Sequence, residues 1–213
     1  NAISLELSGR IQAFVSRQNA QTNSVHRMHV ADVPQLERLP GHLKENIAAE
    51  VFQPVIEIHP VVRNMLDMDL TCVSAICQES MSQQSVMPMH DVFSVGRECR
   101  AMYFVVGGEM AYVHGNNAPS RLAVGSWASE LALFLVWEHQ GLMRVMEIPC
   151  ELALINVAAF HVVLRQWPQV KEFCRLYALE VVAEYSSLVD ELSDLPLASQ
   201  SIDHLVEQAM QSW

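Results

Sequence analysis

Residues 105–117, VVGGEMAYVHGNN, place two short apolar segments on either side of the pair Gly107-Gly108. A glycine pair between two such segments is a strong hairpin signal, because glycine adopts positive φ at no steric cost. Gly115, Asn116 and Asn117 then mark the end of the second segment. The stretch therefore predicts a strand, a turn and a second strand in the middle of the chain.

Short β-prone segments continue on both sides of this hairpin. From about Ser85 onwards they read SVMPMHDVFSVG, AMYFVVGG, EMAYVHG, SRLAVGS and LMRVMEIPCELALI. Between the fourth and the fifth, SELAL opens a short apolar helix. Strands this short, separated at each step by turn residues, are typical of a compact barrel or roll.

Helical patterns precede this β-rich region. Apolar residues recur every four positions at Ile3, Leu7, Ile11 and Val15, and a second stripe consists of Leu36, Leu39, Leu43, Ile47 and Val51. Pro40 suits the first turn of that second helix. We expect Pro54 and Pro60 to break FQPVIEIHPVVRNMLDMDL into short helical pieces, and TCVSAICQESM to form another helix.

Helical patterns also follow the β-rich region. NVAAFHVVLRQWP is expected to stop at Pro168, and the next segment has one broad apolar face made of Phe173, Leu176, Tyr177, Val181, Tyr185, Leu188 and Leu192. DLPLASQ reads as a linker, and SIDHLVEQAMQSW as a short final helix capped by Ser201.

The charge balance excludes several classes of partner. The net charge is −11 with 13 lysines and arginines, so duplex nucleic acid and anionic lipid, which need clustered cations, are not expected as main partners. Five scattered cysteines are typical of reduced, buried thiols inside a cell. No apolar run approaches the length of a membrane helix. Because the chain starts in helical pattern without a methionine, we expect a piece of a longer protein.

Signals of catalysis and of metal binding are missing from the sequence. His26 and His29 in HRMH have helical spacing but no third ligand nearby, so no metal site is expected. No nucleophile elbow, Walker A loop or dinucleotide fingerprint is present. We therefore do not expect an enzyme.

The order of motifs resembles the cyclic nucleotide-binding domain, an eight-stranded β-roll flanked by helices. The resemblance runs through SVMPMHDVFSVGRECRAMYFVVGGEMAYV, VGSWASELALF and CELALINVAAFHVVL, with MYFVVGGEM matching the strand-turn-strand signature. HDVFSVG stands where a Pro-Gly-Asp turn is usual, and here its glycine is missing. Upstream, ERLPGHLKENIAAEVF is similar to the helical C-linker of voltage-gated-type ion channels.

The resemblance, which covers roughly Leu5 to Leu192, implies an α+β fold. A helical C-linker would precede an antiparallel β-roll of about eight strands, of double-stranded β-helix or jelly-roll-like type, with flanking C-terminal helices. We expect residues 1–70 to be the C-linker-like region, residues 71–192 the nucleotide-binding-like domain, and residues 193–213 a linker with a short helix.

The family also implies a ligand site for cAMP or cGMP. Its glutamate, which takes the ribose hydroxyl, matches Glu130, and the residues whose amides face the ligand match Leu131 and Ala132. Ala128 and Ser129 stand where an aromatic residue and a glycine are usual, with Trp127 as a substitute aromatic. Arg175, on the helix that would cover the pocket, would meet the base.

The phosphate arginine of the family is replaced by His139, followed by Gln140 and Gly141. Near neutral pH a histidine with an ordinary pKa is mostly uncharged and offers fewer donors than a guanidinium. Arg144 is five positions further, about 16 Å along a strand, and does not compensate. The loss of a bidentate charged pair would weaken ligand binding by about 2–4 kcal/mol. We therefore expect cyclic nucleotide binding to be weak or absent.

More ordinary roles are open for the same residues. Glu130 could pair or cap at a helix start, Trp127, Trp137 and Phe134 could be core aromatics, and Arg175 could be exposed on its helix. His139 fits a hydrogen-bonded loop histidine better than a ligand-holding one. One further hypothesis is that the downstream segment LPLASQ, residues 195–200, fills an empty pocket.

These expectations together favour a cytosolic regulatory module of an ion channel. The resemblance implies that the roll and its last helix shift the helical arm, which acts on a pore domain in the same chain, and that sister subunits assemble as a homotetramer. One alternative is a ligand-independent interaction scaffold in a non-channel assembly. Another is a genuine cAMP or cGMP sensor. Membrane helices in the chain upstream would favour the channel.

Overall fold

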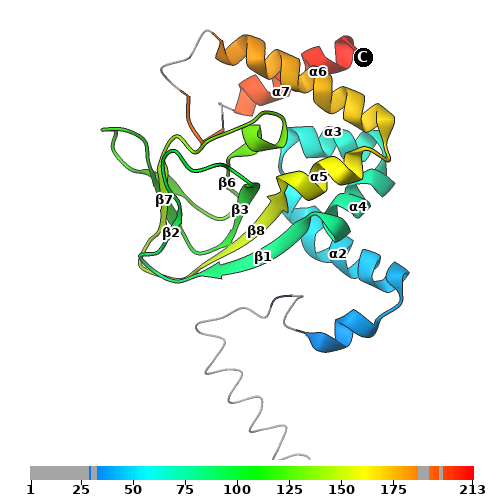
Figure 1. Cartoon of the computed structure of the whole chain (residues 1–213), viewed down its shortest axis with the longest axis horizontal. Coiled ribbons are helices and arrows are strands. Elements are labelled where there is room, and N and C mark those ends of the chain that lie inside the picture. Colours follow the sequence, from blue (N-terminus) through cyan, green and yellow to red (C-terminus); the bar gives the residue numbers. More distant parts are fainter. Residues whose placement is uncertain (1–28, 30–32, 187–191, 197–198) are drawn as a thin grey trace, which may run out of the picture.

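The computed structural model describes residues 29, 33–186, 192–196 and 199–213. Figure 1 shows a β-roll with helices gathered along one side of it. This arrangement confirms the expected α+β class, with an eight-stranded antiparallel roll between two helical regions. The amphipathic segment expected over residues 3–15 and the position of Leu188 lie outside the described residues.

Among the described residues, four helical elements precede the roll: η2 (Pro34–Arg38), α2 (Gly41–Ile56), α3 (Pro60–Met68) and α4 (Leu70–Glu79). Pro40 precedes the first turn of α2 instead of lying in it, because its ψ of 148° is extended. Asp69 caps α4, since its carboxylate accepts from the amides of Thr71 at 2.9 Å and Cys72 at 3.2 Å. The expected helix over TCVSAICQESM is therefore present and begins slightly earlier.

The expectation that Pro54 breaks a helix is wrong, because α2 continues through Pro54 to Ile56. A proline inside a helix costs about 3 kcal/mol. Phe52 and Ile56, on either side of it, are buried, and each such side chain contributes about 1.5–3 kcal/mol. Packing of the last turn of α2 therefore offsets the loss of one hydrogen bond. The break falls at Pro60, which opens α3 as expected.

The roll consists of two four-stranded antiparallel sheets. The first has the strand order β1-β8-β3-β6 and the second β2-β7-β4-β5. Their bounds are β1 (Met81–Val86), β2 (Asp91–Phe93), β3 (Ala101–Gly107), β4 (Met110–Val113), β5 (Ser120–Leu122), β6 (Trp127–Ala128), β7 (Leu142–Val145) and β8 (Cys150–Asn156). Strand β1 starts four residues before the expected Ser85, because the polar run MSQQ pairs along β8.

The hairpin of β3 and β4 needs Gly108 on steric grounds. Its φ of 79° is left-handed, and a Cβ there would lie 2.5 Å from the carbonyl oxygen of Pro149. Only glycine combines that backbone conformation with so close an approach. The turn that suggested the fold from sequence is therefore also a packing contact with the start of β8.

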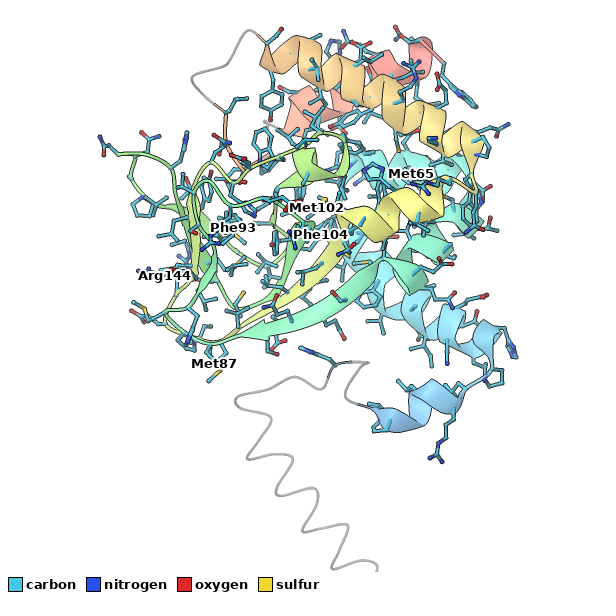
Figure 2. The ribbon with its side chains drawn as sticks, in the orientation of Figure 1. Met65, Met87, Phe93, Met102, Phe104 and Arg144 are labelled. Carbon is cyan, nitrogen blue, oxygen red and sulfur yellow. The ribbon has the colours of Figure 1, made fainter. Side chains whose placement is uncertain are left out.

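Side chains of β3 alternate between two hydrophobic clusters. Met102 and Phe104 belong to the cluster shared with the helices, which also contains Met65 of α3. Val105 of β3 belongs to the cluster enclosed by the two sheets, together with Phe93 of β2, which Figure 2 shows within the roll. Because successive strand residues point to opposite faces, β3 joins the roll to the helical layer.

In the part of the chain that the structure describes, three helices follow the roll: α5 (Val157–Leu164), α6 (Pro168–Tyr185) and α7 (Ser199–Gln211). The expected apolar face of α6 is buried at Phe173, Tyr177, Val181 and Tyr185. Ser201 lies inside α7, so the expected cap at Ser201 is wrong; the local sequence SQS offers two serines, and the helix begins at the first. Figure 1 shows α6 and α7 side by side, next to α3.

The five cysteines are free and buried, as expected. Burial raises the pKa of the thiols of Cys72 and Cys77 to about 12, which keeps them protonated. Among the described residues, no helix is long and apolar enough to span a membrane.

Candidate functional site

A buried carboxylate from the C-terminal segment lies against the loop that follows η3 (Glu130–Leu133). The carboxylate is the side chain of Asp194, a residue that is only 2% exposed. Its atom Oδ1 accepts hydrogen bonds from Trp137 Nε1 at 3.0 Å and from His139 Nδ1 at 2.9 Å. Ser129 Oγ lies 3.3 Å from the same oxygen. The Oδ1 atom of Asp194 is thus surrounded by donors from the residues on either side of η3.

The second oxygen of Asp194 binds backbone amides and a phenol. Oδ2 accepts from the amide of Gln140 at 2.7 Å, the amide of Gly141 at 3.0 Å and Tyr112 Oη at 2.9 Å. Successive amides that converge on one oxygen form an anion-binding nest, which favours carboxylate or phosphate groups. The residues expected to hold a cyclic phosphate, His139 and Gln140, therefore do surround an anion, and that anion is Asp194.

Main-chain contacts fix the same segment in place. The amide of Ser129 donates to the carbonyl oxygen of Asp194 at 2.6 Å, and the amide of Asp194 donates to Tyr112 Oη at 3.0 Å. Ser129 adopts left-handed φ and ψ of 62° and 35°, at the position where the family resemblance implies a glycine. A non-glycine residue in this region costs about 1–2 kcal/mol. The contacts of Asp194 hold Ser129 in that conformation.

The electrostatics of the pair correct the expectation that His139 is uncharged. Burial by itself lowers the pKa of His139, but the hydrogen bond to Asp194 and the contact with Cys99 raise that pKa to about 9. Burial likewise tends to raise the pKa of Asp194, yet the bonds from His139 and Trp137 keep this pKa below its ordinary value. Near neutral pH the two groups form a buried ion pair, because each stabilises the charge of the other.

The imidazole plane of His139 is set by aromatic packing. The ring of Phe93 stacks on it at a centroid distance of 3.7 Å with an interplanar angle of 6°. Such stacking places Nδ1 toward Asp194 without the rotational freedom of an exposed histidine. His139 is 3% exposed, so it is a core residue of the pocket and not a surface loop histidine.

Glu130 does not reach Asp194 by any recorded contact. Its carboxylate is buried and accepts from His59 Nε2 at 2.9 Å and from Trp127 Nε1 at 2.8 Å. Leu131 and Ala132 are also buried, and the amide of Ala132 bonds back to the Ser129 carbonyl at 3.2 Å. The structure thus brings Ser129, His139 and Gln140 together around Asp194, while Glu130 faces the helices.

The two arginines considered from sequence are engaged on the surface. Arg175 is exposed on α6 and pairs with Glu172 at 2.7 Å. Arg144 pairs across the β2–β7 edge with Asp91 at 2.5 Å. Neither contributes a recorded contact to the pocket of Asp194.

Sequence reasoning missed Asp194, Tyr112 and Trp137 as site residues. The hypothesis that the downstream segment fills the pocket had the right region, but the residue that enters is Asp194, one position before LPLASQ. An acidic residue two positions before a proline in a linker carries no local signal of burial. Its partners are more than 50 positions away, so only the folded chain brings them together.

Substitution of Gly141 by alanine is expected to disturb this pocket. A Cβ at Gly141 would lie 2.4 Å from the ring of Tyr112, which itself bonds Asp194. We expect a loss of about 1–3 kcal/mol in the free energy of unfolding, measured by urea denaturation. Gly41→Ala is the control, because nothing lies within 4 Å of a Cβ there. Equal stability of the two variants would contradict the packing described.

The described residues contain no cluster of three or more histidine, cysteine, aspartate or glutamate side chains that could hold a metal ion. No protein-family model and no curated protein matches the sequence. Among solved structures, the C-linker/CNBHD of zELK channels, crystallized in the presence of cAMP, matches with a TM-score of 0.53 over 77% of each chain. The identity is 17%. This likeness confirms the fold, that of a cyclic nucleotide-binding domain with helices before and after the β-roll.

Proposed function

We propose that this chain is a cytosolic regulatory C-linker and cyclic nucleotide-binding-like module of an ion channel, in which Asp194 occupies the anion site. Cyclic nucleotide binding is then weak or absent. The observation that supports this is the buried carboxylate of Asp194, which takes donors from His139 and from the amides of Gln140 and Gly141. A regulatory rather than enzymatic role agrees with the fold.

Competition explains why the occupant excludes a cyclic phosphate. A segment tethered in the same chain is present at an effective concentration in about the millimolar range. A free nucleotide must displace it, and the displaced carboxylate loses its charged hydrogen bond with His139. The ligand also finds Glu130 bonded to His59 and Trp127, so a ribose hydroxyl has to compete for that carboxylate.

Calorimetric titration with cAMP and cGMP tests this proposal. The native chain is expected to give no binding heat, and Asp194→Ala is expected to gain it. His139→Arg alone is expected to stay silent, because Asp194 still neutralises the guanidinium, whereas the double variant binds. Asp203→Ala, at an exposed position of α7, is the matched control. Micromolar binding by the native chain, or equal binding by His139→Arg with and without Asp194, would overturn the proposal.

We further propose that the unit acts with sister subunits beneath a membrane pore in the same full-length chain. Residues 1–70 would form the coupling arm, residues 71–192 the roll with its helices, and residues 193–213 the segment that carries the occupant. Analytical ultracentrifugation of the chain at several concentrations tests the assembly, with a tetramer as the expected species. A chain that stays monomeric and binds no nucleotide in any variant would favour the alternative of a ligand-independent interaction scaffold.

A further inference from the structure

Glu130 lies at the meeting point of three parts of the fold. Its Oε2 accepts from Trp127 of β6 and from His59, which directly precedes α3. Burial and the nearby Glu130 charge raise the pKa of Tyr177 on α6, which places that phenol close to the same carboxylate. Strand β6, the α2–α3 junction and helix α6 therefore converge on one buried acidic side chain.

His59 is held mainly through this contact. Its ring packs edge-on against Trp127 at a centroid distance of 5.0 Å, and its Nδ1 has no hydrogen-bond partner among the described residues. The backbone of His59 belongs to the junction, because its carbonyl accepts from the amide of Arg63 at 3.0 Å in the first turn of α3. A movement of the Glu130 carboxylate would therefore act on the residue that directly precedes α3.

The residue next to Glu130 contacts the pocket occupant. Ser129 donates its amide to the Asp194 carbonyl at 2.6 Å and has left-handed φ, whereas Glu130 begins η3. Asp194→Ala keeps this carbonyl but removes the carboxylate, and with it the 3.3 Å contact to Ser129 Oγ and the bonds from His139, Gln140 and Gly141 that anchor the segment against Ser129. If Ser129 then relaxes, the peptide plane and the side chain of Glu130 turn with it.

We propose that Glu130 is a positioning residue that transmits the state of the Asp194 pocket to the α2–α3 junction through its hydrogen bond to His59. This inference rests on the proposed function, since it requires Asp194 to be the occupant. The family resemblance assigns the Glu130 side chain to a ligand ribose, whereas here it would position the helices that precede the roll through His59. The bistable element is the corner at Ser129, which the occupant and the junction both bias.

The chain contains reporters that separate the steps. The indole N–H of Trp137 donates to Asp194 and reports on the pocket, while that of Trp127 donates to Glu130 and reports on the connector. The indole of Trp167 bonds Thr71 at 3.2 Å and serves as an internal reference. Hydrogen exchange of the peptide covering residues 57–68 reports on the α2–α3 junction.

The experiment measures how Asp194→Ala changes these signals in three backgrounds: native, His59→Leu, which removes the donor, and His59→Gln, which restores one. In the native background we expect the Trp137 and Trp127 resonances to shift and exchange in residues 57–68 to rise about three- to tenfold. The rise in exchange should vanish with His59→Leu and return in part with His59→Gln. A purely structural contact would not produce this dependence on background.

The outcomes distinguish the two proposals. An unmoved Trp137 resonance would show that Asp194 does not occupy the pocket, and the proposed function itself would fail. A shifted Trp137 resonance with unchanged exchange in residues 57–68, or an equal rise in the His59→Leu background, would overturn the role of Glu130 alone. If His59→Leu does not fold, the ring nitrogen resonances of His59 in the native background decide: Asp194→Ala must shift Nε2, and an unmoved signal overturns the inference.

Discussion

Replacement of Asp194 by alanine is expected to lower the free energy of unfolding by about 3–5 kcal/mol, because it leaves a buried imidazolium without its partner. The donors from Trp137 Nε1 and the amides of Gln140 and Gly141 would also lose their acceptor. Each unsatisfied buried donor costs about 1–3 kcal/mol, although these terms overlap within one network. Urea denaturation followed by circular dichroism measures the loss.

Two comparison variants make this prediction specific. Asp194→Asn preserves the shape of the side chain but presents an NH2 group to a shell made of donors, so we expect a loss of similar size. Asp203→Ala, on the exposed side of α7, is expected to change stability by no more than about 0.5 kcal/mol. A loss below about 1 kcal/mol for Asp194→Ala would contradict a buried, fully bonded carboxylate.

Stability is expected to fall as pH rises from about 6.5 to about 9, because of His139. The folded pKa of His139 is about 9, above its ordinary value of 6.5, so the folded state binds the proton more tightly. The stabilisation is therefore fully present below about pH 6.5 and is lost as pH rises through about 9. The difference between the ordinary and the folded pKa of His139 corresponds to about 3 kcal/mol in the free energy of unfolding.

Comparison with His139→Gln isolates this contribution. Buried thiols such as Cys72 also have a raised pKa, so the unfolded chain releases their protons first and stability declines further above about pH 8.5. This thiol contribution is the same in the native protein and in His139→Gln. The difference between native and His139→Gln stability should shrink steadily between pH 6.5 and pH 9. A difference that does not change with pH would mean that His139 is uncharged in the fold.

The β-roll could be predicted from sequence because its signals are local. The Gly107-Gly108 turn, the short interrupted strands and the apolar faces of the flanking helices follow from backbone sterics and side-chain periodicity. Errors arose where packing outweighed local preference. Helix α2 continues through Pro54 because Phe52 and Ile56 are buried, and the polar start of β1 is a strand because it pairs with β8.

The candidate site was predictable only in part. The family pattern directed attention to Ser129, Glu130, His139 and Gln140, and all four are in the η3 region. The pattern did not show that His139 is charged, because the partner that raises its pKa lies 55 positions away. It also assigned Glu130 to a ligand, whereas the carboxylate binds His59, which is 71 positions away.

The sequence by itself determined the class of fold and the order of its elements, since both depend on neighbouring residues; the replacement of a phosphate arginine by His139 is what the family resemblance implies. Only the tertiary structure decided what the pocket contains and where Glu130 points. Burial of a charge is favourable only when distant donors converge on it. Asp194 therefore looks like any linker aspartate until Tyr112, Trp137, His139 and the amides of Gln140 and Gly141 surround it.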